Sequence, residues 1–191
     1  MPPAPLTIRP AHLDDAPALA RTHYESWMHA YRGVIDDAWL STLSPLGFEG
    51  YHRPRLTPNA PPGEVYLVAV NPREPSIVAG FARCGPTRDK TPTGDPLPEG
   101  FAPRYACELY AIYVHPQRMG AGVGRALLAA AFDAARTLGS DSMCVWVLSG
   151  NRQARRFYEA SGAVLCGDAP ITLGGRMYPQ TAYHWTPISR A

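Results

Sequence analysis

The first third of the chain repeats bulky side chains at intervals of four residues, which is the spacing of one face of a helix. The residues of this stripe are Leu19, His23, Trp27 and Tyr31. We expect a helix that opens at Asp14-Asp15 and ends at Gly33. A strand is predicted before it at residues 6–9. A short helix at residues 36–43 should follow and be broken at Pro45, before a loop at residues 52–63.

Short apolar runs separated by turn residues predict the strands of the remaining chain. They lie at residues 65–70, 77–84, 105–114, 143–148, 163–166 and 181–185. The first two should form an antiparallel pair across the turn at Asn71-Pro72. The third and fourth are apolar on both faces, which is typical of central strands. Helical patterns occupy residues 120–138 and 151–161.

The order of these elements predicts one domain of mixed α/β (α+β) class over residues 1–191. It gives a mixed sheet with helices on its faces. The chain is long enough to bury one sizeable core, and two full domains are not expected. Residues 85–103 are rich in Pro, Gly, Thr and Asp and form a long loop, a feature that is usually functional or mobile.

Composition and charge narrow the classes of function. The formal net charge is +2 and the pI about 8.4, which is too mild to indicate a nucleic acid or a membrane surface as partner. The beginning of the chain lacks the apolar core of a signal peptide, so we expect a soluble, cytoplasmic protein. Cys84, Cys107, Cys144 and Cys166 are scattered, which favours free thiols over disulfides or a metal site.

Gly120, Gly122 and Gly124 crowd the start of the helix predicted at residues 120–138. A glycine inside a helix costs about 1 kcal/mol relative to alanine, so this spacing needs a reason. No Ser, Thr, Asp or Asn directly precedes the helix, and its first N–H groups therefore lack a cap. Such a start binds anions. The alternative is a flexible turn with a close helix–strand contact. The pattern fits neither a P-loop nor a Rossmann fingerprint.

The run Gln117-Arg-Met-Gly-Ala-Gly122 resembles the (Arg/Gln)-x-x-Gly-x-(Gly/Ala) signature of the GNAT superfamily of N-acetyltransferases. Downstream, the segment from Asn151 to Gly162 resembles a second family motif, Asn…Ala…Phe-Tyr-Glu…Gly. The opening Ile8-Arg9-Pro10 also resembles the usual start of the family. The resemblance covers nearly the whole chain. It departs at Ala163, where the family often has Phe.

This resemblance implies the GNAT fold, a mostly antiparallel mixed sheet flanked by helices, with acetyl-CoA between splayed parallel central strands at residues 105–114 and 143–148. The backbone of the first strand would pair with the pantetheine arm, and N–H groups from Arg118 to Gly124 would hold the pyrophosphate. Asn151 would bind the pantetheine, and Tyr158 would lie near the sulfur. The cofactor-binding residues implied are Ile112, Tyr113, Val114, Gln117, Arg118, Met119, Gly120, Ala121, Gly122, Val123, Gly124, Arg125, Asn151 and Tyr158.

Acetyl transfer to an amine requires a neutral amine, a donor for the developing oxyanion and a proton for the departing thiolate. Glu108 is the candidate base, because it interrupts an apolar strand on the face expected to hold Tyr110 and Ile112. Its alternative is a structural ion pair, for example with Arg83. Tyr158 is the candidate acid by the resemblance, with core packing as its alternative. Asn151 is also a natural N-cap.

The acceptor should be recognised by Trp27 and Tyr31, because the segment from Trp27 to Gly33 resembles the helix that borders the acceptor cleft in one group of the family. Their alternative role is core packing. We therefore predict an acetyl-CoA-dependent N-acetyltransferase that acts on a primary amine of a small molecule or peptide by direct attack, without a metal. A non-catalytic acyl-CoA sensor and transfer of a longer acyl group remain alternatives. Homodimers are frequent in such a family.

Overall fold

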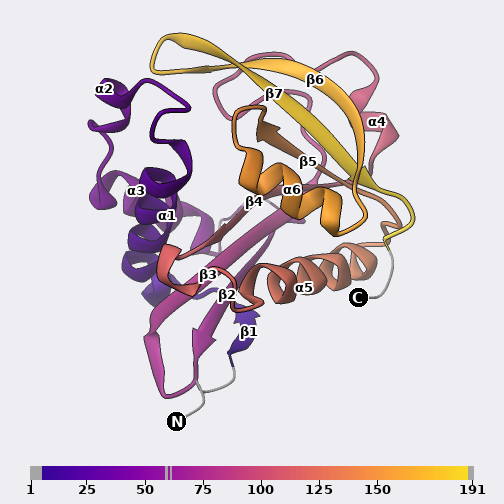
Figure 1. Cartoon of the computed structure of the whole chain (residues 1–191). Coiled ribbons are helices and arrows are strands. Elements are labelled where there is room, and N and C mark those ends of the chain that lie inside the picture. Colours follow the sequence, from indigo (N-terminus) through magenta and orange to yellow (C-terminus); the bar gives the residue numbers. More distant parts are fainter. Residues whose placement is uncertain (1–5, 59, 61, 189–191) are drawn as a thin grey trace.

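The computed structural model describes residues 6–188 except residues 59 and 61. The two ends of the predicted domain, residues 1–5 and 189–191, lie outside the described residues. A 7-stranded sheet in the order β1-β2-β3-β4-β5-β7-β6 forms the centre (Figure 1). Its strands are β1 (Thr7–Pro10), β2 (Val65–Asn71), β3 (Glu74–Pro86), β4 (Cys107–Val114), β5 (Met143–Leu148), β6 (Val164–Leu173) and β7 (Arg176–Trp185).

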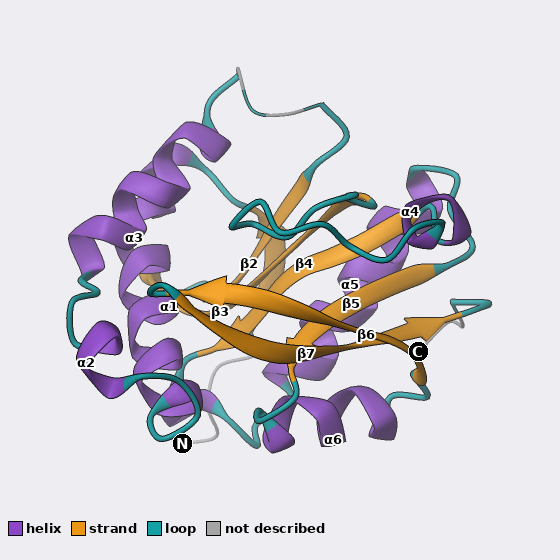
Figure 2. Cartoon of the chain, turned by 90° about the horizontal axis from the view of Figure 1, so that it is seen from above, coloured by secondary structure: helices purple, strands orange, loops and turns teal. Residues whose placement is uncertain are grey.

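The two central strands, β4 and β5, are the parallel pair of this sheet, and the other pairings are antiparallel. Their pairing is short. Cys107 lies opposite Met143 and Glu108 opposite Cys144, and no pairing continues beyond these positions. The remainder of each strand diverges from the other, as Figure 2 shows. The predicted mixed sheet with splayed parallel central strands is confirmed.

Helices cover both faces of the sheet. On one face α1 (Ala16–Tyr31) packs against β3 and β4 and against α3, and on the other α5 (Val123–Thr137) packs against β2, β3 and β4. The remaining helices are α2 (Asp37–Leu40), α3 (Pro45–His52), α4 (Phe101–Arg104) and α6 (Arg152–Ala160), with 3-10 turns η1 (Leu13–Asp15), η2 (Arg53–Leu56) and η3 (Pro116–Arg118). The stripe of Leu19, Trp27 and Tyr31 faces inward, as the period of four predicts.

Two local predictions are wrong. The break expected at Pro45 is instead the first residue of α3, because the Ser44 hydroxyl caps this helix by accepting a hydrogen bond from the Gly47 N–H at 3.2 Å. The loop expected at residues 52–63 instead starts with the last residue of α3, His52, and the η2 turn. Pro and Gly inside a helix break it, but Pro at the first position of a helix is favourable.

The last two strands are longer than predicted. Residues 163–166 and 181–185 cover only one end of each strand, and β6 and β7 continue to a turn at Gly174-Gly175. The hairpin reaches α2, where the Asp36 N–H donates to the Tyr178 hydroxyl at 2.9 Å. The β6–β7 hairpin therefore lies across one end of the region where β4 and β5 diverge. Much of this hairpin is exposed, so its sequence lacks the continuous apolar run of a central strand.

A bulge in β4 changes the predicted alternation of its side chains. Arg83 of β3 pairs with Ala111 and the next residue, Cys84, pairs with Leu109, so Tyr110 is the extra residue. After the bulge, Ile112 packs with Leu109 in the core cluster beneath α5. The expectation that Glu108, Tyr110 and Ile112 share one face is therefore wrong.

Candidate active site

A cavity of about 1060 Å³ lies over the divergence of β4 and β5 and continues to the start of α5 and to α1. Most of the residues predicted as binding residues line it. They are Trp27, Tyr31, Ile112, Tyr113, Val114, Arg118, Met119, Gly120, Gly122, Val123, Gly124, Arg125, Asn151 and Tyr158. Glu108, Gln117 and Ala121, also predicted for the site, are not among its lining residues. The structure thus brings segments from most of the chain around one space.

The glycine turn at the start of α5 presents uncapped backbone donors to this cavity. Gly120 and Gly122 have φ angles of 75° and 80°, in the region that favours glycine. Gly122 is the N-cap residue, and no side chain caps the helix. Within the described chain, no protein group accepts a hydrogen bond from the backbone N–H groups of residues 120–125. These donors and the helix dipole suit the turn to bind an anion, as the sequence predicts.

The three glycines of this turn have different roles. A Cβ atom on Gly120 or Gly122 would meet no atom within 4 Å, so these two serve the backbone conformation and the open approach to the turn. A Cβ atom on Gly124 would lie 3.4 Å from the Phe157 ring and 3.6 Å from Val114. Close packing of α5 against its neighbours, the alternative proposed for the whole turn, therefore explains Gly124.

The hydroxyl groups of two tyrosines meet at the centre of the cavity wall. Tyr31 of α1 and Tyr113 of β4 lie with their oxygen atoms 3.1 Å apart. Burial raises the pKa of both phenols, that of Tyr113 especially, so both stay protonated in the physiological range. Tyr113 was predicted only for its backbone. The sequence carried no signal for this pair, because 82 residues separate its members.

Tyr158 and Asn151 enter the cavity from α6. Tyr158 is 5% exposed, and burial together with the neighbouring Tyr31 raises the pKa of its hydroxyl. Its proton is therefore retained at neutral pH. The Asn151 Oδ1 atom accepts a hydrogen bond from the Ala154 N–H at 3.1 Å, so its predicted role as N-cap is confirmed. That bond leaves the Nδ2 group on the cavity side, where Asn151 also contacts the Tyr31 hydroxyl.

The edge of β4 that faces the cavity carries backbone N–H and C=O groups. One of these carbonyl groups already accepts a hydrogen bond from the protein. The Ser26 hydroxyl donates a hydrogen bond to the Val114 carbonyl at 3.0 Å. A carbonyl has a second lone pair, and the Ile112 backbone groups point the same way in the part of β4 that β5 no longer pairs, whereas those of Tyr113 point to Phe81 of β3. An extended ligand can therefore add to this edge as a strand does.

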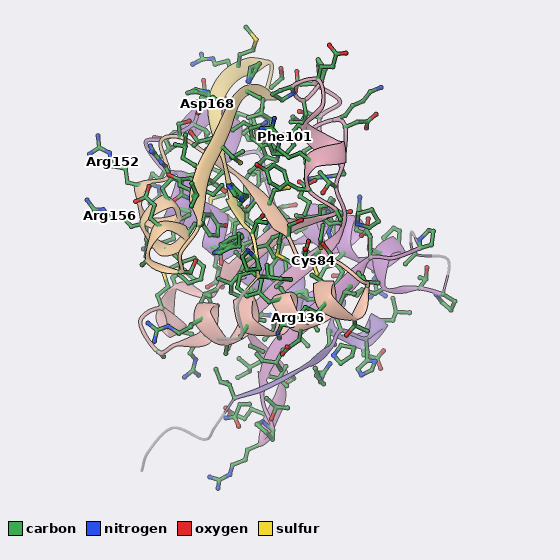
Figure 3. All side chains as sticks on the ribbon, turned by 90° about the vertical axis from the view of Figure 1, so that its right-hand side faces the viewer. Cys84, Phe101, Arg136, Arg152, Arg156 and Asp168 are labelled. Carbon is green, nitrogen blue, oxygen red and sulfur yellow. The ribbon has the colours of Figure 1, made fainter. Side chains whose placement is uncertain are left out.

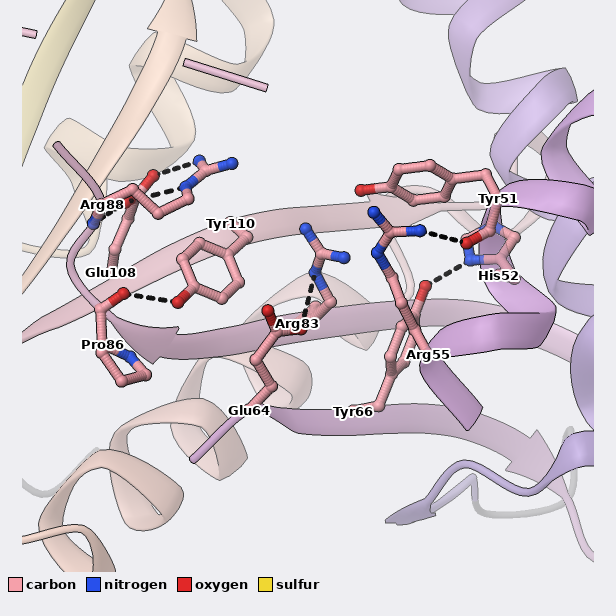
Figure 4. A network of polar contacts seen from close by, with 10 residues as sticks. All are labelled: Tyr51, His52, Arg55, Glu64, Tyr66, Arg83, Pro86, Arg88, Glu108 and Tyr110. Carbon is pink, nitrogen blue, oxygen red and sulfur yellow. Dashed lines mark hydrogen bonds and ion pairs between the residues drawn. The ribbon is translucent and has the colours of Figure 1, made fainter. Parts of the chain in front are cut away.

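Glu108 is fully buried and bound to Arg88 (Figure 4). Its carboxylate accepts hydrogen bonds from the Arg88 backbone N–H at 3.0 Å, from Nε at 3.1 Å and from Nη2. The alternative of an ion pair is thus observed, but with Arg88 and not with Arg83. Arg88 itself lines the cavity. The loop predicted at residues 85–103 is also tied to β6, where Asp95 accepts hydrogen bonds from Thr172 at 2.9 and 2.8 Å.

Aromatic side chains surround the end of the cavity next to α1, where the sequence predicts the acceptor. His23, Trp27, Phe48 and Tyr51 line the cavity there, from α1 and α3. Trp27 contacts Tyr31 with ring centroids 4.9 Å apart, so both predicted acceptor residues lie at the cavity and also pack together. The sequence does not predict Phe48 and Tyr51 as site residues, because its pattern predicts no helix at residues 45–51.

Other features of the chain lie apart from the cavity. Arg152 and Arg156 project outward from α6, as Figure 3 shows, which fits a solvated helix face. Cys84, Cys107 and Cys144 are buried and Cys166 is partly buried, and all four are free thiols, as predicted. Over the residues the structure describes, no group of three or more His, Cys, Asp or Glu side chains is placed to hold a metal ion. No helix among them is both long and apolar enough to span a bilayer.

The family follows from comparison with known sequences. The sequence model of the Acetyltransferase (GNAT) family matches residues 21–163. The chain belongs to the GNAT family. It is 30% identical over 184 residues to the uncharacterized N-acetyltransferase YuaI of Bacillus subtilis (strain 168), covering 96% of this chain and 95% of that protein. The predicted family membership is confirmed.

Two further GNAT comparisons concern acceptor and cofactor. The chain is 28% identical over 165 residues to an L-methionine sulfoximine/L-methionine sulfone acetyltransferase of Salmonella typhimurium, covering 86% of this chain and 84% of that protein. The structure of YncA from Salmonella typhimurium with its cofactor acetyl-CoA is similar, with a TM-score of 0.61 and 26% identity. That match covers 95% of this chain and 93% of the YncA chain.

Proposed function

We propose that this GNAT protein is an acetyl-CoA-dependent N-acetyltransferase that acts on a primary amine by direct attack in a ternary complex. The observation that carries the proposal is the continuity of one cavity from the uncapped amides of the glycine turn, along the unpaired edge of β4, to the aromatic acceptor side. The pantetheine arm would follow β4, and the diphosphate would bind at Gly120 and Gly122. The complex of YncA with acetyl-CoA supports this cofactor.

The cavity offers the groups that the reaction needs. When bound, acetyl-CoA supplies an activated acetyl group as a thioester. The backbone N–H of Ile112, on the open edge of β4, can stabilise the negative charge that develops on the carbonyl oxygen. Tyr158, which keeps its proton at neutral pH, can donate that proton to the departing thiolate. No cysteine is found among the described lining residues, which favours direct attack over an acyl-enzyme.

Glu108 has a different task in this proposal from the one its sequence position suggested. Its carboxylate is buried, bound to Arg88 and not part of the cavity lining. A general base must lie within hydrogen-bond reach of the amine, directly or through one water molecule. We infer that Glu108 positions Arg88 and that the amine loses its proton to water in the cavity.

Binding and turnover separate this proposal from the acyl-CoA sensor. The purified chain is heated with acetyl-CoA or CoA to measure the shift in Tm, and thiol release from acetyl-CoA is then followed over a panel of primary amines. We expect a raised Tm and thiol release with at least one amine. Binding without release from any amine would favour the sensor.

A conservative variant provides the matched control for this assay. Tyr158→Phe removes one hydroxyl and keeps the ring, so acetyl-CoA should still raise the Tm. Loss of a general acid lowers kcat by a factor of about 100 or more. An unchanged kcat would remove Tyr158 from the catalytic role while leaving the transferase assignment in place.

A further inference from the structure

Several buried polar atoms at the cavity wall or behind it have no hydrogen-bond partner among the residues that the structure describes. In the described part of the chain, the unpartnered buried side-chain atoms are Nε2 of His23, Nε1 of Trp27, Nε and Nη1 of Arg83, and Nε1 of Trp146. The tryptophan and arginine atoms are N–H donors. Because an unsatisfied buried donor is costly, this set indicates a ligand rich in hydrogen-bond acceptors.

A chain of hydrogen bonds makes the His23 Nε2 atom a donor as well. His23 Nδ1 lies 3.1 Å from His52 Nε2, and His52 Nδ1 contacts the Tyr66 hydroxyl. Elsewhere among the described residues, no group accepts a hydrogen bond from that hydroxyl. Its proton therefore points to His52 Nδ1, His52 Nε2–H donates to His23 Nδ1, and His23 Nε2 carries a proton. If the hydrogen bonds ran in the opposite direction, from His23 through His52 to Tyr66, the hydroxyl proton of Tyr66 would have no acceptor.

Burial keeps both histidines neutral, as this chain of donors requires. Burial, together with the charges of Arg83 and Arg55, lowers the pKa of His52 to about 3. Burial, His52 and Arg83 hold the pKa of His23 well below its ordinary value. The positive charge on this side of the cavity therefore resides on the arginines.

Arg83 is the least satisfied of these groups. Its side chain is 6% exposed, and its nearest carboxylate, Glu64, lies 3.8 Å from Nε, beyond hydrogen-bond length. Figure 4 shows the guanidinium group between the Tyr110 ring on one side and the Arg55 guanidinium with the Tyr51 ring on the other. Its central carbon lies 5.5 and 5.0 Å from those ring centroids. Both tyrosines line the cavity, and Arg83 lies behind them, outside the lining itself.

The surroundings of Arg83 hold an excess of positive charge. The guanidinium groups of Arg55, Arg83 and Arg88 outnumber the carboxylates of Glu64 and Glu108. The Glu108 carboxylate accepts hydrogen bonds from the Nε and Nη2 groups of Arg88. These bonds fix the Arg88 side chain at the cavity wall. A buried guanidinium without a hydrogen-bonded partner is unfavourable, and an anion that reaches it relieves the cost.

We propose that the amine acceptor carries an anionic oxygen group, of the carboxylate class, that binds between Tyr51 and Tyr110 on the guanidinium of Arg83. Arg88 and the His23 Nε2–H flank this subsite: the His23 ring lies 6.1 Å from the Tyr51 ring. The inference rests on the proposed function and adds the acceptor's chemical class. Glu108 then acts as a positioning residue for the arginine that borders the acceptor.

Matched acceptors test the subsite in the unmodified protein. Thiol release from acetyl-CoA is measured with a panel of L-amino acids, with the carboxamide of each, and with the corresponding amines that lack the carboxyl group. The carboxamides have the lower amine pKa and hence more of the reactive neutral amine. A preference for the carboxylates therefore cannot come from amine basicity. We expect kcat/KM to be roughly tenfold higher, or more, for the carboxylates that react best.

Substitution of Arg83 tests where the preference arises. Arg83→Met should reduce the gap between an amino acid and its carboxamide to about threefold or less, because the charge-assisted contact is lost. The KM for acetyl-CoA should not change. Arg83→Lys should retain part of the preference. Arg73→Met, at an exposed position in the turn between β2 and β3, is the matched control. This variant should keep the full preference for carboxylates.

The outcomes distinguish the inference from the proposed function. Neutral acceptors used as well as carboxylates would overturn the anionic subsite and leave the transferase assignment standing. An unchanged preference in a folded Arg83→Met variant would overturn the role of Arg83. Thiol release with none of the acceptors, although acetyl-CoA raises the Tm, would overturn the proposed function and the inference with it.

Discussion

The hydroxyl of Tyr31 lies 3.1 Å from the hydroxyl of Tyr113, and this contact joins α1 to β4 at the wall of the cavity. The helix borders the acceptor side and the strand borders the proposed path of the pantetheine arm. One hydrogen bond thus connects the two halves of the proposed site. The sequence predicts an acceptor role for the segment of Tyr31 and a cofactor role for the segment of Tyr113.

A double-mutant cycle should detect this bond. Tyr31→Phe and Tyr113→Phe each leave one buried hydroxyl without its partner, and each should lower the free energy of unfolding by about 1 kcal/mol. The double variant should cost less than the sum by a comparable amount. Urea unfolding measures all four proteins. Strict additivity would show that the two hydroxyls do not interact.

Glu108→Gln should affect stability and acceptor binding more than proton transfer. The substitution removes the negative partner of Arg88, and a hydrogen-bonded charge pair of this kind contributes about 2 kcal/mol. The KM for the amine should rise, because Arg88 is no longer fixed. The shape of the pH–rate profile should stay the same. Loss of a limb from that profile would return Glu108 to the role of base.

The glycine turn can be tested with two substitutions of equal backbone strain. Gly122→Ala and Gly175→Ala both place a side chain at positive φ, 80° and 76°, with no atom within 4 Å of the new Cβ. Each should destabilise the fold by about 1 kcal/mol. Only Gly122→Ala should also weaken acetyl-CoA binding, by calorimetric titration. Equal affinities in the two variants would separate the turn from the cofactor.

The buried histidines make stability depend on pH. Both keep a lowered pKa in the folded protein, that of His52 at about 3, whereas in the unfolded chain they bind protons near pH 6.5. The unfolded state therefore gains protons first as pH falls from about 6.5 toward 3. The free energy of unfolding should decrease through that window, by up to about 1.4 kcal/mol per pH unit for each histidine.

Urea unfolding at pH 7, 6 and 5 measures this slope. His52→Gln should be less stable at pH 7 but should show a shallower decline with acidity, because one titrating group is gone. His29→Gln, at an exposed position of the same helix as His23, is the control and should keep the slope. A His52→Gln variant with the original slope would contradict neutral, buried histidines.

The sequence predicted most of the architecture because its signals are local. The apolar runs at β4 and β5 and the helix after the glycine turn follow from periodicity, and the motifs at Gly120 and Asn151 pointed to the ends of the helices that border the cavity. The missed helix at Pro45 and the long β6–β7 hairpin have weaker local signals. Polar and exposed residues in these segments were read as loop, and tertiary contacts decide their structure.

The charged part of the proposed acceptor side could not be predicted from the sequence, because it is assembled from distant residues. Arg83, Arg88 and Glu108 come from β3, the following loop and β4, and no spacing in the chain relates them. The bulge at Tyr110 shifts the faces of β4 by one residue, which simple alternation cannot anticipate. His23 was counted as one position of a helical stripe, while its partner His52 lies at the end of α3.

A crystal structure of the chain grown with acetyl-CoA tests the central claim most directly. The account predicts the diphosphate on the backbone N–H groups of residues 120–124 and the pantetheine arm along β4 where β5 no longer pairs with it. The acetyl group should lie between Tyr158 and the Tyr31–Tyr113 pair. Coenzyme bound elsewhere, or a diphosphate held without those amides, would contradict the account.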